Sequence, residues 1–188
     1  FGDNRDLHLC LRRQRQMCIR DSIYIQSNKG SKMEISIKGG SKSQKVYARS
    51  VIEFCANKMM STRLANTLTI KLQFMPLYEK HRQMGNCSWE DDSYRPKEFL
   101  IEIDPNNRLR RVLESICHEM VHVKQFAKGE MRDLARAEKV SFFGKQYDTS
   151  IDEYFERPWE IEAHGRELGL FVRWAEKHKL GHLKWTHD

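Results

Sequence analysis

The sequence lacks any apolar run long enough to cross a bilayer, because charged and polar residues interrupt every apolar stretch. A membrane-spanning helix needs about 20 predominantly apolar residues in succession. The amino-terminal segment also lacks the apolar centre of a secretory signal. We therefore expect a cytoplasmic protein with no membrane partner.

Paired cysteines are missing as well. The five cysteines are an odd number and show no repeated short spacing, which argues against a disulfide framework and against a zinc site built from thiolates. Cys55 and Cys117 lie in helical apolar patterns and are predicted to be core residues. Cys87 lies in a polar stretch, residues 75–97, that we expect to form a long loop or insertion near a functional cleft.

The first 22 residues show no helical or strand period that would bury a face. They resemble translated sequencing-adapter sequence, and Met33 is a plausible natural start. Of the 188 residues, 39% are apolar and 31% charged, a composition typical of a globular protein. We expect residues 33–188 to form a single domain, monomeric by default.

The remaining chain is basic. The first 22 residues contribute five arginines and three aspartates, so they account for +2 of the formal charge of +7. Lysines gather near residues 29–45, and such a surface can attract nucleic acid. No zinc finger, recognition helix or basic stripe with interleaved aromatic residues accompanies it, so nucleic acid remains an alternative partner.

The apolar periods predict an α+β domain. Ser41 and Gln44 form a capping-box pattern at the start of a helix. Leu68, Ile70, Leu72 and Phe74 alternate with polar residues, which is typical of a strand with one buried face. In chain order we predict strand 33–38, helix 41–61, strand 68–74, strand 99–104, a helix from about 105 to Gly129, a hairpin turning at Gly144 within 140–148, and a helix from Pro158 to about 179.

The most informative motif is His118-Glu119-Met120-Val121-His122, the pattern HExxH, within a predicted helix. Residues four apart on a helix lie one turn above each other, so both imidazoles can reach one metal ion while Glu119 stands beside it. This arrangement suits zinc-assisted hydrolysis.

The apolar residues of this helix form a separate stripe. At about 100° per residue, Val112, Leu113, Ile116 and Met120 fall within about 60° of Leu109. His118 and His122 point away from that stripe, at about 180° and 220°. The histidines are therefore predicted to face a cleft, with exposure to solvent as the alternative.

Catalytic zinc commonly has three protein ligands, so a third must come from elsewhere. On the later helix Glu160 is predicted to point inward, whereas Glu162 falls on the polar side at about 200°. The inward face is predicted to comprise Ile161, Leu168, Phe171, Val172, Trp174 and Ala175. A buried unpaired carboxylate is costly, and bound zinc would compensate it. His164, one turn beyond Glu160, is the alternative ligand or a hydrogen-bond partner of a ligand.

Two less specific interpretations remain open here. The later helix can be an ordinary amphipathic helix whose Glu160 pairs with an arginine. Tyr147 and Tyr154, on the segment between the two helices, are candidates to donate a hydrogen bond to an oxyanion, although aromatic residues in such positions more often pack.

Residues 33–180 resemble small zincin-type metallopeptidases. The HExxH helix and the later Pro-Trp-Glu-Ile-Glu-Ala segment are similar to those of small SprT-like or gluzincin-like peptidases of tailed phages and bacteria. SprT-like peptidases carry a third histidine shortly after the motif, and here none occurs between His122 and His164. The glutamate pattern fits better. The resemblance implies a minimal zincin-like fold with a small mixed sheet, ligands His118, His122 and Glu160, and Glu119 as general base.

We therefore expect a zinc metallopeptidase that hydrolyses a polypeptide substrate, located in the host cytoplasm if the chain is viral. Glu119 would take a proton from a zinc-activated water and pass it to the leaving amine. Strand 99–104, if it lies at a sheet edge, could hold an extended substrate. The rival interpretation is a catalytically silent zincin-fold adaptor that binds nucleic acid or a protein through its basic surface.

Overall fold

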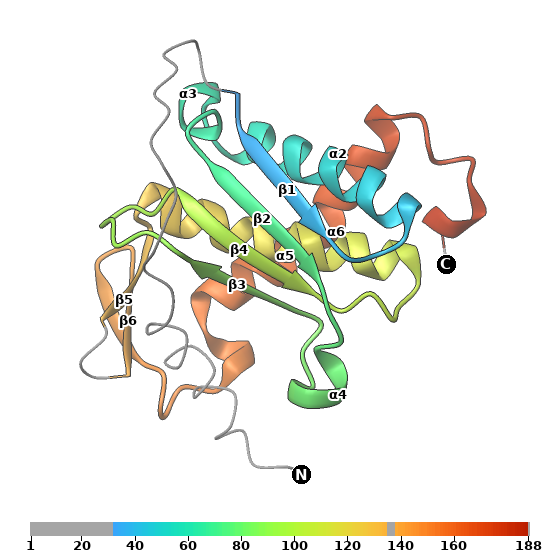
Figure 1. The fold of residues 1–188 in the computed structure, drawn as a ribbon. Helices are drawn as coiled ribbons and strands as arrows, with labels where there is room; N and C mark the ends of the chain where they lie inside the picture. Colours follow the sequence, from blue (N-terminus) through green and yellow to red (C-terminus); the bar gives the residue numbers. More distant parts are fainter. Residues whose placement is uncertain (1–31, 135–137, 188) are drawn as a thin grey trace.

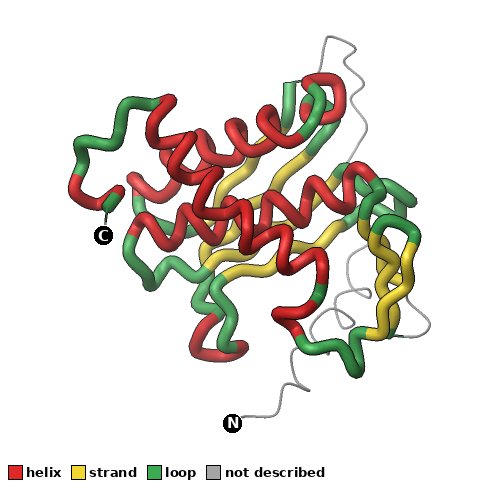
Figure 2. The backbone as a smooth tube through the Cα atoms, turned by 180° about the vertical axis from the view of Figure 1, so that it is seen from behind, coloured by secondary structure: helices red, strands yellow, loops and turns green. Residues whose placement is uncertain are grey.

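The computed structural model describes residues 32–134 and 138–187, which form helices packed on a four-stranded sheet and a smaller three-stranded sheet (Figure 1). Seen from behind, the long helices lie in front of the larger sheet (Figure 2). The predicted α+β class is confirmed. The segment 1–22, which we excluded from the fold, lies outside the described residues.

The first strand and helix are as predicted. Strand β1 spans Glu34–Lys38 and helix α2 spans Lys42–Met59. The capping box is formed, since the Gln44 amide donates to Ser41 Oγ at 3.2 Å and the Ser41 amide donates to Gln44 Oε1 at 2.8 Å. These bonds satisfy amide groups that the first turn of a helix leaves without partners.

The larger sheet has the order β1-β2-β4-β3. Strands β1, β2 (Thr69–Phe74) and β4 (Glu98–Ile103) are parallel, and β3 (Gly85–Trp89) pairs antiparallel with β4. In β2 the burial alternates along the strand as its sequence predicted. Strands β2 and β4 both have a neighbour on each side, and β4 is the more deeply buried of the two, with Phe99, Ile101, Glu102 and Ile103 all buried.

The prediction of a long loop at residues 75–97 is wrong. This segment contains helix α4 (Tyr78–His81) and the edge strand β3. The sequence of this segment is polar because an edge strand buries few side chains and needs few apolar residues. In β3 only Cys87 is fully buried. Cys87 is therefore not a loop residue, and burial raises the pKa of its thiol.

Strand β4 is not an edge strand, so the condition that we set for substrate binding at residues 99–104 is not met. It lies between β2 and β3, and β3 forms the edge beside it. The backbone groups of β4 are thus committed to neighbouring strands, and an added strand would pair with β3 instead.

Helix α5 spans Leu109–Lys128 and begins later than predicted. The Asp104 carboxylate accepts hydrogen bonds from the amides of Asn106 and Tyr78, each at 2.8 Å, which hold residues 104–108 in a loop. The helix ends at Gly129, which has a φ of 72° as its predicted capping role requires. The predicted apolar stripe is buried, with Leu109 partly buried at its start.

Helix α5 is the centre of the molecule. Its apolar stripe belongs to the hydrophobic core, and its other side contacts α6 (Pro158–Lys177) extensively. Its polar residues Glu114, His118, Glu119, His122 and Gln125 are buried as well. The histidines therefore lie neither in the core stripe nor in open solvent.

Helix α6 starts at Pro158 as predicted, but its buried face differs from the predicted one. Phe171, Trp174 and Ala175 are buried as expected. Ile161, Leu168 and Val172 were predicted to point inward and are 53%, 50% and 41% exposed. The helix packs on α5 through the side that carries Glu160 together with Trp159, Ala163, Leu170, Phe171 and Trp174. The predicted face was too broad and extended to the wrong side of Glu160.

The predicted hairpin is present, as β6 (Lys139–Phe142) and β7 (Lys145–Asp148), and it turns at Gly144. A further strand, β5 (Met131–Leu134), pairs with β6 and was not predicted. The 3₁₀ turn η2 (Tyr154–Glu156) then leads into α6. The remaining short elements are α3 (Thr62–Ala65) and η3 (Lys184–Thr186). Within the described part of the chain, no helix has both the length and the apolarity to span a bilayer.

Candidate metal centre

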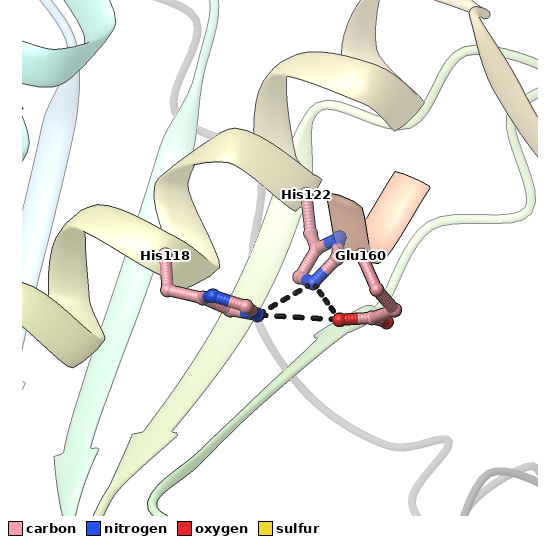
Figure 3. Close-up of side chains that lie close together, drawn as sticks. All are labelled: His118, His122 and Glu160. Atoms are coloured by element: carbon pink, nitrogen blue, oxygen red, sulfur yellow. Dashed lines mark hydrogen bonds and ion pairs between the residues drawn. The ribbon is translucent and has the colours of Figure 1, made fainter. Parts of the chain in front are cut away.

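Side chains from α5 and α6 meet at one point, as Figure 3 shows. His118 Nε2 lies 3.2 Å from His122 Nε2 and 3.4 Å from Glu160 Oε2, and His122 Nε2 lies 3.5 Å from the same carboxylate oxygen. All three residues are buried, and together they could hold a metal ion. The structure thus brings together the three residues that the sequence proposed as ligands.

The three groups strongly affect one another's protonation. Burial alone lowers the pKa of His118, but the hydrogen bonds to Glu160 and Glu167 outweigh it and raise this pKa to about 10. Burial raises the pKa of Glu160, yet the two imidazoles and the Tyr154 hydroxyl hold it far below its usual range. The carboxylate is therefore charged at neutral pH, as a metal ligand must be.

Each histidine has a second partner on the ring nitrogen that faces away from the group. His118 Nδ1 lies 2.8 Å from Glu167 Oε2, and His122 Nδ1 lies 2.9 Å from Gln125 Oε1. When Nδ1 carries the proton and donates it to these oxygens, Nε2 keeps a lone pair toward the group. Such partners fix the ring and its tautomer in metal sites.

Gln125 is itself held in place. Its side-chain amide donates to the carbonyl of Trp159 at 3.0 Å and to Glu162 Oε2 at 3.1 Å. Glu162 also pairs with Lys124 at 2.7 Å and with Arg166 at 2.8 Å. Glu162 thus stays out of the three-residue group, as its helical position predicted, and acts on it only through Gln125.

Glu119 is buried between the motif histidines and strand β3. Burial raises the pKa of its carboxyl above the ordinary value, although the two histidines oppose this. A Cβ atom on Gly85 would lie only 2.5 Å from Glu119 Oε1. The glycine therefore leaves the space in which this carboxylate sits next to the edge strand.

The two candidate tyrosines differ in position. Tyr154 donates a hydrogen bond from its hydroxyl to Glu160 Oε2 at 2.7 Å, and burial beside that carboxylate raises the pKa of the phenol. Tyr147 instead packs edge-on against Trp159, with ring centroids 5.7 Å apart, and lies under Lys145. Tyr154 belongs to the site, whereas Tyr147 has the packing role that we gave as its alternative.

His164, the alternative third ligand, lies at the rim. Its side chain is 43% exposed, and its Nδ1 is 3.3 Å from Glu167 Oε2. Its ring centroid is 4.5 Å from that of His118. His118, His164 and Glu167 form a second group that could hold a metal, but two of its three members are not buried. Glu160 completes the more enclosed group.

The site opens into a cleft of about 830 Å³. Its walls come from α4, the start of β3, the loop before α5, α5 itself, and the segment 154–167. They include His118, Glu119, Tyr154, His164 and Glu167.

Sequence reasoning missed three residues of the site: Gly85, Gln125 and Glu167. Gln125 follows His122 by three positions and Glu167 follows Glu160 by seven, and both spacings place side chains on the same helical face. Those signals were present in the sequence. Gly85 gave no local signal, because its role depends on a strand pairing that the sequence did not predict.

Comparison with known proteins found no family model, no curated protein and no solved structure that matches this chain. The function is therefore inferred from the chemistry of the residues in the cleft.

Proposed function

We propose that the protein is a zinc-dependent metallopeptidase with a minimal zincin-like fold. The observation that carries this proposal is the spacing of the three donor atoms, 3.2, 3.4 and 3.5 Å apart. Ligand atoms about 2.1 Å from a tetrahedral zinc ion lie about 3.4 Å from one another. Two imidazoles and one carboxylate are also a ligand set typical of catalytic zinc.

Zinc bound there would supply the Lewis acidity that lowers the pKa of a water molecule and polarises a peptide carbonyl. Glu119, next to the ligands and with a raised pKa, would accept the proton of the water and donate it to the leaving amine. The raised pKa makes the carboxylate a better proton acceptor than an exposed glutamate. Its burial on the α5 side of the cleft fixes the carboxylate near the ligands.

Tyr154 is the residue we assign to stabilising the developing oxyanion. Its hydroxyl lies 2.7 Å from Glu160 Oε2 and its side chain lines the cleft. The raised pKa keeps the phenol protonated, so it can donate a hydrogen bond. Tyr147 lies outside the residues that line the cleft and is given no catalytic role.

The substrate we propose is an extended polypeptide that lies along β3. Strand β3 is the edge of the sheet, and its first residue, Gly85, contacts Glu119. A peptide added to this edge would form backbone hydrogen bonds that do not depend on its sequence. Its carbonyl groups would pass close to Glu119 and the three ligands.

The test compares the full chain with Glu119→Gln. We expect the purified protein to bind one zinc ion per chain and to cleave an unfolded, fluorescently labelled protein. Glu119→Gln should retain the zinc and lose at least about 100-fold in rate, the usual contribution of a general base. Retained zinc with no cleavage, together with salt-sensitive binding of an oligonucleotide, would instead support the adaptor alternative.

A further inference from the structure

The cleft continues beyond the metal centre toward the amino-terminal end of α5. Arg111, Ser115 and His118 all line it, and Arg111 precedes His118 by seven residues. Seven residues are almost two full turns, so both side chains lie on one stripe of the helix, about 10 Å apart along its axis. The face of α5 that carries His118 therefore also carries the Arg111 guanidinium, nearer the start of the helix.

Arg111 retains charge that its neighbours do not neutralise. Its Nη1 donates to Glu114 Oε2 at 3.0 Å, while Arg110 Nε donates to the other oxygen of Glu114 at 2.7 Å. One carboxylate thus faces two guanidinium groups, which leaves one positive charge in excess. The Arg111 side chain is 67% exposed, so it is accessible from the cleft.

Other hydrogen-bond donors line the cleft where α4 lies against the loop before α5, a contact made by the Tyr78 amide, which donates to the Asp104 carboxylate. Arg82, the residue that follows α4, lies with its guanidinium 5.6 Å from the centre of the Tyr78 ring, and the described residues give it no carboxylate within ion-pair distance. Asn106 and Asn107 come from the loop before α5. The Asn107 side-chain amide contacts only a weak acceptor among the described residues, Met84 Sδ at 3.5 Å.

We propose that this end of the cleft is a subsite for a carboxylate of the substrate, bound by Arg111 and Arg82. The proposal rests on the polypeptide-binding function proposed above and deepens it. An extended peptide advances about 3.3 Å per residue, so 10 Å corresponds to about three residues. The acidic group would thus lie about three residues from the scissile bond, on the side toward the start of α5.

The charges of the cleft favour an acidic peptide over a nucleic acid. Glu119 and Glu167 line the cleft near the metal ligands, and Glu114 lines it next to Arg111. A polynucleotide places a phosphate at every step, so some phosphates would approach these carboxylates. A peptide with a single carboxylate can pair that group with the arginines and place only neutral groups beside the glutamates of the cleft. The carboxylate can belong to an acidic side chain or to the carboxyl terminus.

The test measures binding rather than cleavage, on the zinc-loaded full chain carrying Glu119→Gln. Fluorescence anisotropy would compare amidated peptides that differ only in Glu or Gln at single positions, and a peptide that ends in a free carboxylate. We expect a Glu about three residues from the scissile bond to tighten binding about fivefold, as a partly exposed charge pair does. Comparing this peptide with one that ends in a free carboxylate at the same position would show whether the subsite prefers a side-chain or a terminal carboxylate.

Variants locate the subsite. Arg111→Gln and Arg82→Gln should each abolish most of the difference between the Glu and Gln peptides, with the affinity for the Gln peptide unchanged. Arg110 still pairs with Glu114 in Arg111→Gln, so the fold should survive, and circular dichroism would verify this. The control is Arg173→Gln, an exposed arginine of α6 that does not line the cleft and carries the same charge.

The outcomes separate this proposal from the proposed function. Equal binding of Glu and Gln peptides, no binding of either, or an equal effect of Arg173→Gln would overturn the carboxylate subsite. An oligonucleotide that displaces the acidic peptide and binds more tightly would also overturn it. Preferential binding of acidic peptides that wild type never cleaves would support the subsite and contradict the peptidase function.

Discussion

Two glutamates of α6, two residues apart, have opposite relations to the metal centre. Glu160 Oε2 lies within 3.5 Å of both imidazoles, whereas Glu162 pairs with Lys124 and Arg166. Their helical positions differ by about 200°, so Glu160 points into the metal centre and Glu162 lies beside it. This difference allows a matched test within one turn of helix.

Glu160→Ala should lower the affinity for zinc by more than about 100-fold, because it removes a direct ligand. Glu162→Ala is the matched control and should keep the zinc. Metal content after gel filtration, with affinity from competition against a chelator, would measure both. The assignment of the third ligand is wrong if Glu162→Ala loses zinc and Glu160→Ala retains it.

Glu167→Gln tests the partner of His118. The carboxylate lies 2.8 Å from His118 Nδ1, and a neutral amide there would hold the ring less strongly. We expect the zinc affinity to fall about tenfold, while the stoichiometry at saturating zinc remains unchanged. His164→Ala, which removes the exposed neighbour of Glu167, should leave the affinity within about twofold of wild type. A larger loss in His164→Ala would favour His164 as a ligand.

At the scale of elements, the contact between β3 and α5 determines where Glu119 lies. Gly85→Ala would place a methyl group 2.5 Å from Glu119 Oε1 and 3.0 Å from Ile103 Cδ1. We expect the carboxylate to move, and cleavage to fall at least about tenfold while zinc stays bound. Gly165→Ala is the control, since a Cβ there meets nothing within 4 Å. Full activity in Gly85→Ala would show that the Glu119 carboxylate does not depend on the space beside Gly85.

The elements that the sequence predicted well are those whose burial is encoded locally. The capping box at Ser41 and the alternation of β2 are complete within a few residues. Strand β3 was missed because only Cys87 of it is fully buried. The start of α5 was misplaced because the Asp104 carboxylate binds the amide of Asn106 in the loop and that of Tyr78 in α4.

The candidate site was largely predictable, since HExxH and the inward position of Glu160 are properties of single helices. The width of the buried face of α6 was not. Ile161, Leu168 and Val172 are apolar and lie about 80° to 120° from Glu160 on the helical wheel, and they are exposed. Which side of Glu160 is buried depends on how α6 crosses α5, and that crossing is a property of two helices together.

At the scale of the whole molecule, protons and zinc compete for the same buried histidines. The pKa of His118 rises from 6.5 to about 10 on folding of the metal-free chain. The protonated ring therefore stabilises the metal-free fold fully below pH 6.5, and this stability is lost as the pH rises through about 10. Zinc needs the unprotonated ring, so the gain in stability on zinc binding should grow with pH over the same window.

Thermal unfolding with a chelator and with excess zinc, at about pH 7 and about pH 9, would measure this competition. We expect the increase in Tm caused by zinc to be larger at the higher pH. Glu160→Ala should show a much smaller increase at both. A zinc effect that is equal at both pH values in the wild type would contradict the coupling.

The division of the three candidate ligands between α5 and α6 has a consequence for biosynthesis. Both histidines emerge from the ribosome well before Glu160, which lies on the last long helix of the described chain. A nascent chain that ends before α6 has the motif but not the third ligand, and it also lacks Trp159, Phe171 and Trp174 of the core. If the site is catalytic, the protein acquires its activity only when α6 has docked on α5. Incomplete nascent chains would then have no peptidase activity.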